Sequence, residues 1–118
     1  MNLVEWADTY RILSRESSAR PGKFRTSEVE IARGPMLAVT EPGVHTITVM
    51  CCTQLMKTEF INNIIGYHIH LDPCPILVVQ PSLEMAYAWS KERLAPMLRD
   101  TPALTGIVRE ARSRHSGN

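Results

Sequence analysis

The pattern of hydrophobic and polar positions changes near the middle of the chain. Residues 44–50, VHTITVM, are rich in β-branched side chains, which favour a strand. From Lys57 onward the pattern follows the three- and four-residue spacing of a helix buried along one face, at Phe60, Ile61, Ile64, Ile65 and His68. This helix should end before Asp72-Pro73, because the residue before a proline disfavours the helical conformation. The middle of the chain therefore predicts a strand, a polar turn and a helix.

A second strand and a second helix are predicted further along the chain. Residues 74–80, CPILVVQ, form a short apolar run between prolines, which fits a strand buried on both faces of a parallel sheet. Ser82 can cap a helix over residues 83–100, and Pro96 is a point at which that helix can divide. Strands that alternate with helices predict an α/β fold with a parallel sheet and flanking helices.

The N-terminal part of the chain has weaker signals. Residues 3–9 favour a short amphipathic helix, and Pro21-Gly22 marks a turn in the polar, basic segment that follows. We expect no stable core element in residues 3–9 or in this basic segment. Ser27 and Glu30 have the spacing of a capping box ahead of apolar positions at helical intervals, and Gly34-Pro35 should kink or delay that helix.

These patterns divide the chain near Pro42-Gly43. Residues 1–43 are predicted to be a helical and extended lead-in, and residues 44–118 the first part of an α/β domain. A chain of 118 residues is one domain or part of one. Its content of 44% hydrophobic and 21% charged residues predicts a globular protein rather than a disordered one.

The net charge of the chain is too small for it to attract nucleic acid through overall positive charge. The formal net charge is +1, so any contact with nucleic acid must come from a local group of residues. No apolar run approaches the roughly 20 residues of a membrane-spanning helix, and the acidic N-terminus MNLVEWADTYR does not resemble a secretory signal. We therefore expect a cytoplasmic protein without a membrane partner.

The segment TITVMCCTQLMKTEF, residues 46–60, has the layout of a phosphate-binding loop. In the pattern G-x-x-x-x-G-K-[ST], backbone amides surround the phosphates, the lysine reaches the β- and γ-oxygens, and the hydroxyl holds Mg²⁺. Lys57-Thr58 occupy the last two positions of this pattern, whereas Cys51 and Met56 stand where the glycines would be. Met56 would adopt the unusual backbone of its position at a cost of about 1 kcal/mol or more.

An ordinary turn is the alternative interpretation of the same residues. Thr53 would then cap the helix, and Lys57 would be a solvated charge. The order of strand, short turn, Lys-Thr and helix favours a phosphate at the helix N-terminus, but the pattern alone leaves both interpretations open.

Five stretches carry a resemblance to a known family: VEWAD, ESSARPGKFRT, VMCCTQLMKTE, ILVVQPSLEMAYAWSKERLAPMLRDTPAL and SRHSGN. Together they resemble the ATPase portion of the large terminase subunit of tailed phages, in the lambda-like GpA group. The resemblance covers nearly the whole chain, and its loop motif in that family has the type K-S-A-Q-V-G-K-[ST]-E, of which Gln54, Lys57, Thr58 and Glu59 are kept. A glycine is often missing at the first position in that family, so Cys51 fits it, whereas Met56 departs from it.

The resemblance implies a RecA-like P-loop NTPase and a motor that uses ATP and Mg²⁺ to package double-stranded DNA into procapsids in the host cytoplasm. Lys57 would be the catalytic lysine, Thr58 the Mg²⁺ ligand, and Ser82 and Lys91 weaker candidates for contacts with DNA phosphates. The partners implied are the small terminase subunit, the portal protein and further copies in a ring. The amides that would surround the phosphates belong to Cys52, Thr53, Gln54, Leu55 and Met56.

Hydrolysis in this fold also requires an aspartate at the end of a later strand and a nearby glutamate. No apolar strand ending in acids follows Leu104, so we expect an incomplete N-terminal portion of the domain that does not hydrolyse ATP alone. The family's nuclease domain also lies elsewhere. Two alternatives remain: a degenerate P-loop module that contacts DNA or protein without hydrolysis, and a helicase-like ATPase.

Overall fold

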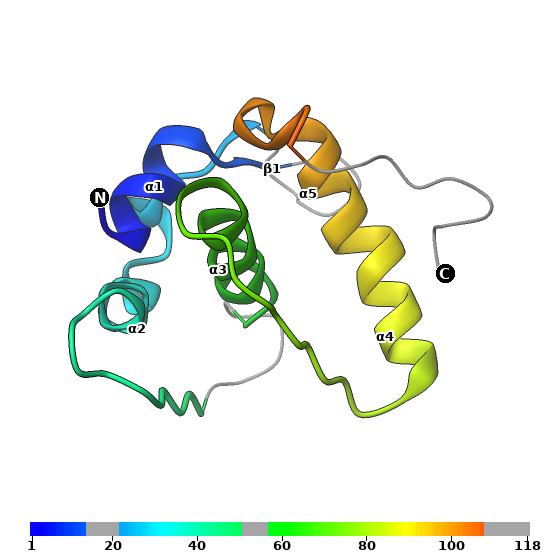
Figure 1. Ribbon diagram of the computed structural model, residues 1–118, viewed down its shortest axis with the longest axis horizontal. Coiled ribbons are helices and arrows are strands. Elements are labelled where there is room, and N and C mark those ends of the chain that lie inside the picture. Colours follow the sequence, from blue (N-terminus) through cyan, green and yellow to red (C-terminus); the bar gives the residue numbers. More distant parts are fainter. Residues whose placement is uncertain (14–21, 51–56, 108–118) are drawn as a thin grey trace.

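Helices make up most of the part of the chain that the structure describes. The structure is a computed structural model that describes residues 1–13, 22–50 and 57–107, with Lys57 described through its backbone. Figure 1 shows α1, α2 and α3 grouped together, with α4 and α5 forming one long helical rod beside them. The elements in chain order are α1 (Leu3–Tyr10), β1 (Ile12–Leu13), β2 (Gly22–Lys23), η1 (Thr26–Glu28), η2 (Glu30–Ala32), α2 (Arg33–Val39), α3 (Lys57–Leu71), α4 (Leu83–Trp89), η3 (Ser90–Leu94), α5 (Ala95–Asp100) and η4 (Pro102–Leu104).

The first helix begins with a capping box and contributes to the centre of the core. Asn2 Oδ1 accepts a hydrogen bond from the Glu5 amide at 2.8 Å, and Glu5 Oε1 accepts one from the Asn2 amide at 2.9 Å. The helix confirms the prediction for residues 3–9, but the expectation of no stable core element in these residues is wrong. Leu3 and Trp6 are fully buried, because α2 and α3 cover this short helix.

The segment between α1 and α2 forms local structure that differs from the predicted capped helix. β1 and β2 pair in antiparallel fashion, with Ile12 opposite Lys23. Two 3₁₀ turns follow, and Ser27 makes no capping hydrogen bond, so the predicted Ser27–Glu30 capping box is wrong. The α-helix starts only at Arg33, which confirms the delay expected from Gly34-Pro35, because a proline in the first turn needs no hydrogen-bond acceptor.

The third helix agrees with its prediction in length but not in its most buried face. It spans Lys57–Leu71 and ends before Asp72-Pro73, as expected. Its most buried positions include two asparagines, while the expected apolar positions Phe60 and Ile64 are only partly buried. Among residues 58–71, whose burial the structure describes, four positions are buried: Asn62, Asn63, Ile65 and Gly66.

The two predicted strands of a parallel sheet are not formed in the described residues. Residues 44–50 and 74–80 belong to no ladder, and the one sheet in the described part of the chain is the β1–β2 pair. Met50, Leu77 and Val79 are 97%, 87% and 80% exposed. A strand requires hydrogen bonds to a neighbouring strand, and these segments have no such neighbour among the described residues. The connection from α3 to α4 runs as an open trace in Figure 1.

The last long helix stays continuous past Pro96. Its residues Ser90–Leu94 form a π-helical segment, and α5 continues directly from it. A wider turn just before Pro96 accommodates the missing amide donor, which explains why the predicted division at Pro96 does not occur. Burial begins at Pro96 and Met97, whereas α4 has no buried residue. No helix in the described ranges is both long and apolar enough to cross a membrane.

Candidate nucleotide-binding site

The predicted phosphate-binding loop leads directly into α3. Its residues Cys51, Cys52, Thr53, Gln54, Leu55 and Met56 lie outside the described residues. Lys57 is the first residue of α3, and Thr58, the second, is partly buried. The predicted helix from Lys57 onward is therefore confirmed, while the turn before it and the phosphate and metal roles of these residues stay predictions.

A buried arginine holds the first two turns of α3. One terminal nitrogen of Arg11, Nη2, donates to Glu59 Oε1 in an ion pair, and the other, Nη1, donates to Asn63 Oδ1 at 2.6 Å. The Arg11 side chain is 1% exposed and that of Glu59 is 26% exposed. Since Glu59 immediately follows Lys57-Thr58, the guanidinium group of Arg11 binds α3 next to the predicted site.

The backbone of Arg11 is held on both sides. Arg11 is the C-cap of α1, and its amide donates to the Ala7 carbonyl at 3.0 Å. Its own carbonyl accepts from the Phe24 amide at 3.0 Å, and its guanidinium carbon lies 6.0 Å from the centre of the Phe24 ring. These contacts tie the end of α1 and the start of the segment after β2 to the first turn of α3.

Burial and charge act on Arg11 in opposite directions. Burial lowers the pKa of the Arg11 guanidinium below its ordinary value, while the charge and hydrogen bond of Glu59 raise the pKa of Arg11 in partial compensation. Arg11 Nε is buried without a partner in the described structure. Removing Glu59 would leave a buried cation with less compensation, which is the strongly destabilising way to break such a pair.

The same helix face continues towards α1 beyond Asn63. Trp6 Nε1 donates to His70 Nδ1 at 2.9 Å, and the Tyr10 and His70 rings form a T-shaped pair with centroids 4.9 Å apart. Gly66 lies between these contacts, against the Trp6 ring. We call the set of α3 residues that contact α1 or its C-cap the α1-facing stripe: Glu59, Asn63, Gly66 and His70.

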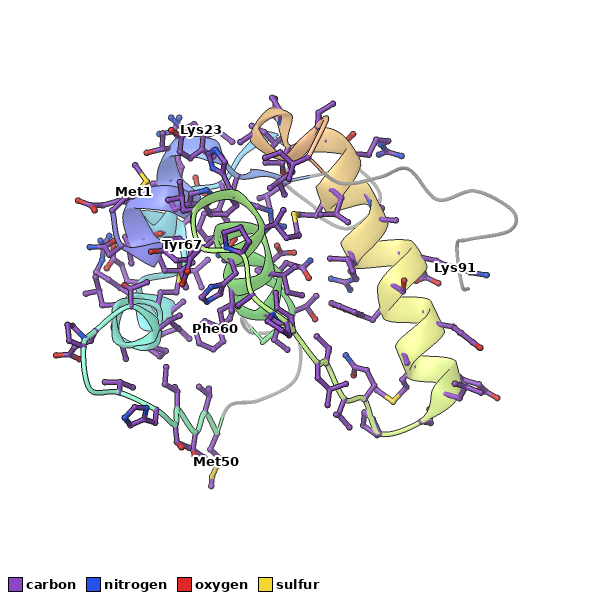
Figure 2. The ribbon with its side chains drawn as sticks, viewed as in Figure 1. Met1, Lys23, Met50, Phe60, Tyr67 and Lys91 are labelled. Carbon is purple, nitrogen blue, oxygen red and sulfur yellow. The ribbon has the colours of Figure 1, made fainter. Side chains whose placement is uncertain are left out.

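A further contact ties the chain start to α3. Tyr67 Oη donates to the Met1 carbonyl at 3.1 Å, and Figure 2 shows both residues on the same side of the core. None of these partners was identified from the sequence pattern. Hydrophobic periodicity marks apolar residues at helical spacing, whereas the residues of the α1-facing stripe are polar or, at Gly66, lack a side chain. The sequence signal that indicates this stripe is a row of polar residues and a glycine on one helix face, at successive spacings of four, three and four residues.

The two weaker candidates for DNA contact occupy the long helix. Ser82 Oγ accepts from the Met85 amide at 3.2 Å, which confirms the predicted cap of α4. Lys91 lies in the π-helical segment, is exposed, and projects away from the rest of the molecule in Figure 2. Their proposed contacts with DNA phosphates stay predictions.

The histidines near the end of α3 have structural partners. His68 Nδ1 lies 3.2 Å from the Asp72 carbonyl oxygen and 3.5 Å from its carboxylate, while His70 binds Trp6. Across residues 1–13, 22–50 and 57–107, no group of three or more His, Cys, Asp or Glu side chains could hold a metal ion.

Comparison with known proteins identifies the family. The family described as "Phage terminase large subunit gpA, ATPase domain" matches residues 18–118. The chain therefore belongs to the ATPase domain family of the phage terminase large subunit gpA. It is also 24% identical to the "Terminase, large subunit" of Enterobacteria phage P21 over 118 residues, which is 100% of this chain and 18% of the relative. The chain thus spans about a fifth of that relative's length. No solved structure gives a significant match.

Proposed function

We propose that this chain is the nucleotide-binding first part of the ATPase domain of a large terminase subunit, a motor that packages viral DNA into procapsids. The observation that carries the proposal is the start of α3 at Lys57-Thr58, directly after the predicted loop and beside the buried pair of Arg11 and Glu59. A helix N-terminus favours a phosphate group through its unpaired amides and its dipole. Family membership makes ATP the expected nucleotide.

Each residue of the proposed site has a separate role. Lys57 neutralises charge on the γ-phosphate, and the Thr58 hydroxyl binds Mg²⁺. The amides of residues 52–56 surround the phosphates. MgATP supplies the free energy that the motor converts into movement of DNA.

The proposed fold is a RecA-like domain with a parallel sheet, to which residues 44–50 and 74–80 contribute two strands. Their exposed apolar side chains support this, because Leu77 and Val79 would be covered by neighbouring strands and helices. The remaining strands, including the one with the metal-binding aspartate, belong to parts of the motor outside these residues. Double-stranded DNA, the small terminase subunit, the portal protein and further copies of the subunit in a ring are the proposed partners.

The test of the proposed site is DNA-stimulated ATP hydrolysis by the full-length protein that carries this chain. Lys57→Ala should lower the rate at least about a hundredfold, since a lost charge-stabilising group in phosphoryl transfer has effects of this order. Lys23→Ala is the matched control, because Lys23 is an exposed lysine on β2 and lies well away from Phe60 of α3 in Figure 2. Hydrolysis that is indifferent to Lys57→Ala would end the assignment.

Met56 supports a second candidate, a degenerate P-loop module that contacts DNA or protein without using ATP. A side chain at the position before the lysine opposes the backbone conformation that brings the amides to the phosphates. Binding of MgATP to the full-length protein before and after Met56→Gly separates the candidates. The motor predicts measurable binding in the unchanged protein, whereas the degenerate module predicts binding only after the substitution, or none.

Substitution of Ser82 and of Lys91 tests the proposed contact with DNA. Lys91→Ala should weaken binding to DNA of any sequence and reduce the salt dependence by about one phosphate contact. Ser82→Asp keeps a capping side chain but adds a negative charge, so it should weaken DNA binding while the helix stays intact. Unchanged DNA affinity in both variants would assign Ser82 to capping alone and Lys91 to the solvated surface.

A further inference from the structure

We propose that Arg11 is a positioning residue for the nucleotide site, because it holds and neutralises the Glu59 carboxylate beside Lys57 and Thr58. The inference rests on the proposed function, to which it adds a residue 46 positions before Lys57 in the chain. The carboxylate of Glu59 would otherwise be a negative charge in the first turn of the helix that receives the phosphates.

The position of Glu59 creates the electrostatic problem. It is the third residue of α3, and a helix rises about 1.5 Å per residue, so its backbone lies about 3 Å along the axis from that of Lys57. A carboxylate in the first turn stabilises a helix through the dipole, but it repels a phosphate bound at the same helix end. Its repulsion is largest for ATP, which carries one more negative charge than ADP.

The geometry of Arg11 answers this problem. Its guanidinium binds the Glu59 carboxylate and, one turn further along α3, the Asn63 side chain. The Arg11 side chain that makes both bonds is 1% exposed, and the Arg11 backbone is hydrogen-bonded to Ala7 and Phe24. Glu59 is therefore directed towards α1, away from the solvent side of the first turn, and its charge is compensated by a cation that water screens little.

A second Arg–Glu pair in the chain shows what an ordinary surface contact looks like. Arg33 and Glu30 are three residues apart, with side chains 40% and 58% exposed, and Arg33 Nε lies 2.8 Å from Glu30 Oε1. Such exposed pairs contribute little to stability. The pair of Arg11 and Glu59 spans 48 residues and is largely buried, so it fixes one particular helix turn relative to α1.

The experiment measures binding of MgATP and MgADP to the full-length protein by isothermal titration calorimetry. Arg11→Met should weaken ATP binding about tenfold and ADP binding by a smaller factor, because the uncompensated carboxylate acts most on the γ-phosphate. Arg11→Met combined with Glu59→Gln should return ATP affinity to within about threefold of the unchanged protein, because the repelling charge is gone. Arg33→Met is the matched control, since it also removes one cation from an Arg–Glu pair and should leave both affinities unchanged.

Two further measurements separate this role from a purely structural one. The first is thermal unfolding of every variant, which shows which of them fold. The second is nucleotide binding by Arg11→Lys. This variant keeps the positive charge, so it should keep the ratio of ATP to ADP affinity even if its melting temperature is lower. If Arg11→Met does not fold, the ratio of ATP to ADP affinity in Arg11→Lys is the deciding measurement. A lower ratio in Arg11→Lys, caused by a loss of ATP affinity, would overturn the proposal. A folded Arg11→Met variant with unchanged ATP affinity, or a double variant without recovery, would also overturn it.

The failure of this inference differs from the failure of the proposed function. If Lys57→Ala abolishes ATP binding while Arg11→Met behaves like Arg33→Met, the nucleotide site stands and the role of Arg11 falls. If Lys57→Ala leaves ATP binding unchanged, both fall together.

Discussion

The indole ring of Trp6 lies directly against Gly66, where an added Cβ atom would come within 2.4 Å of Trp6 Cη2. Trp6 is fully buried, so other protein atoms cover its ring on all sides. This close approach allows α1 to pack against α3, with Arg11 at Glu59 on one side of the contact and Trp6 at His70 on the other. The contact therefore supports the helix whose first turn carries Lys57 and Thr58.

Gly66→Ala should destabilise the protein by about 1–3 kcal/mol, because overpacking against a buried ring outweighs the better helix propensity of alanine. The measurement is the free energy of unfolding from chemical denaturation. Gly34→Ala is the matched control, since an added Cβ at this helical glycine meets nothing within 4 Å. We expect that control to be neutral or to stabilise by up to about 1 kcal/mol. A Gly66→Ala variant as stable as Gly34→Ala would contradict the close packing.

Replacing His70 should destabilise the protein through Trp6. His70→Phe removes the acceptor of the Trp6 indole N–H and leaves that buried donor without a partner, at a cost of about 1–3 kcal/mol. The chemical shift of the Trp6 indole proton, measured by NMR, should change in parallel with the loss of stability. His45→Phe is the control at an exposed histidine and should change neither quantity. An unchanged indole signal in His70→Phe would show that the bond does not form.

Asp8 should stabilise the segment that follows β2. Its Oδ1 accepts from the Thr26 amide at 2.7 Å and from the Thr26 hydroxyl at 2.8 Å, and Thr26 is fully buried. Asp8→Ala should lower the free energy of unfolding by about 1–3 kcal/mol, since both donors lose their acceptor. Thr26→Ser keeps both bonds and should cost less than Thr26→Val, which keeps the shape but removes the hydroxyl. Equal losses for Thr26→Ser and Thr26→Val would argue that packing, not the hydrogen bond, matters there.

The lowered pKa of Asp100 leads us to expect that stability depends on pH in the acidic range. The hydrogen bond from Arg99, with Nε 2.6 Å from Oδ1, lowers the pKa of Asp100 below its ordinary value of 3.8. A carboxyl whose pKa is lowered by folding stabilises the fold above its unfolded pKa, and this contribution is lost as the pH falls through the folded value. Titration by NMR should show a rise of the Asp100 pKa towards 3.8 in Arg99→Gln. An unchanged Asp100 pKa in that variant would contradict the pairing.

Much of the helical structure follows from local sequence. Asn2 with Glu5, the three- and four-residue spacing after Lys57, and the Ser82 cap each act within a few residues, and the structure has helices at all three places. Residues 44–50 and 74–80 show the opposite case. Their β-branched and apolar composition predicts strands, but a strand is completed by a neighbour distant in sequence, and none pairs with them among the described residues.

The sequence by itself determined where α3 begins, that Lys57-Thr58 stand at that point, and that the chain has the motifs of a terminase ATPase. Only the tertiary structure decided what surrounds that helix start. The contacts of Arg11 with Glu59 and Asn63, and of Trp6 with Gly66 and His70, join residues 48 to 64 positions apart. Hydrophobic periodicity describes which face of one helix is apolar, and it carries no information about which polar group a second helix will bring to meet it.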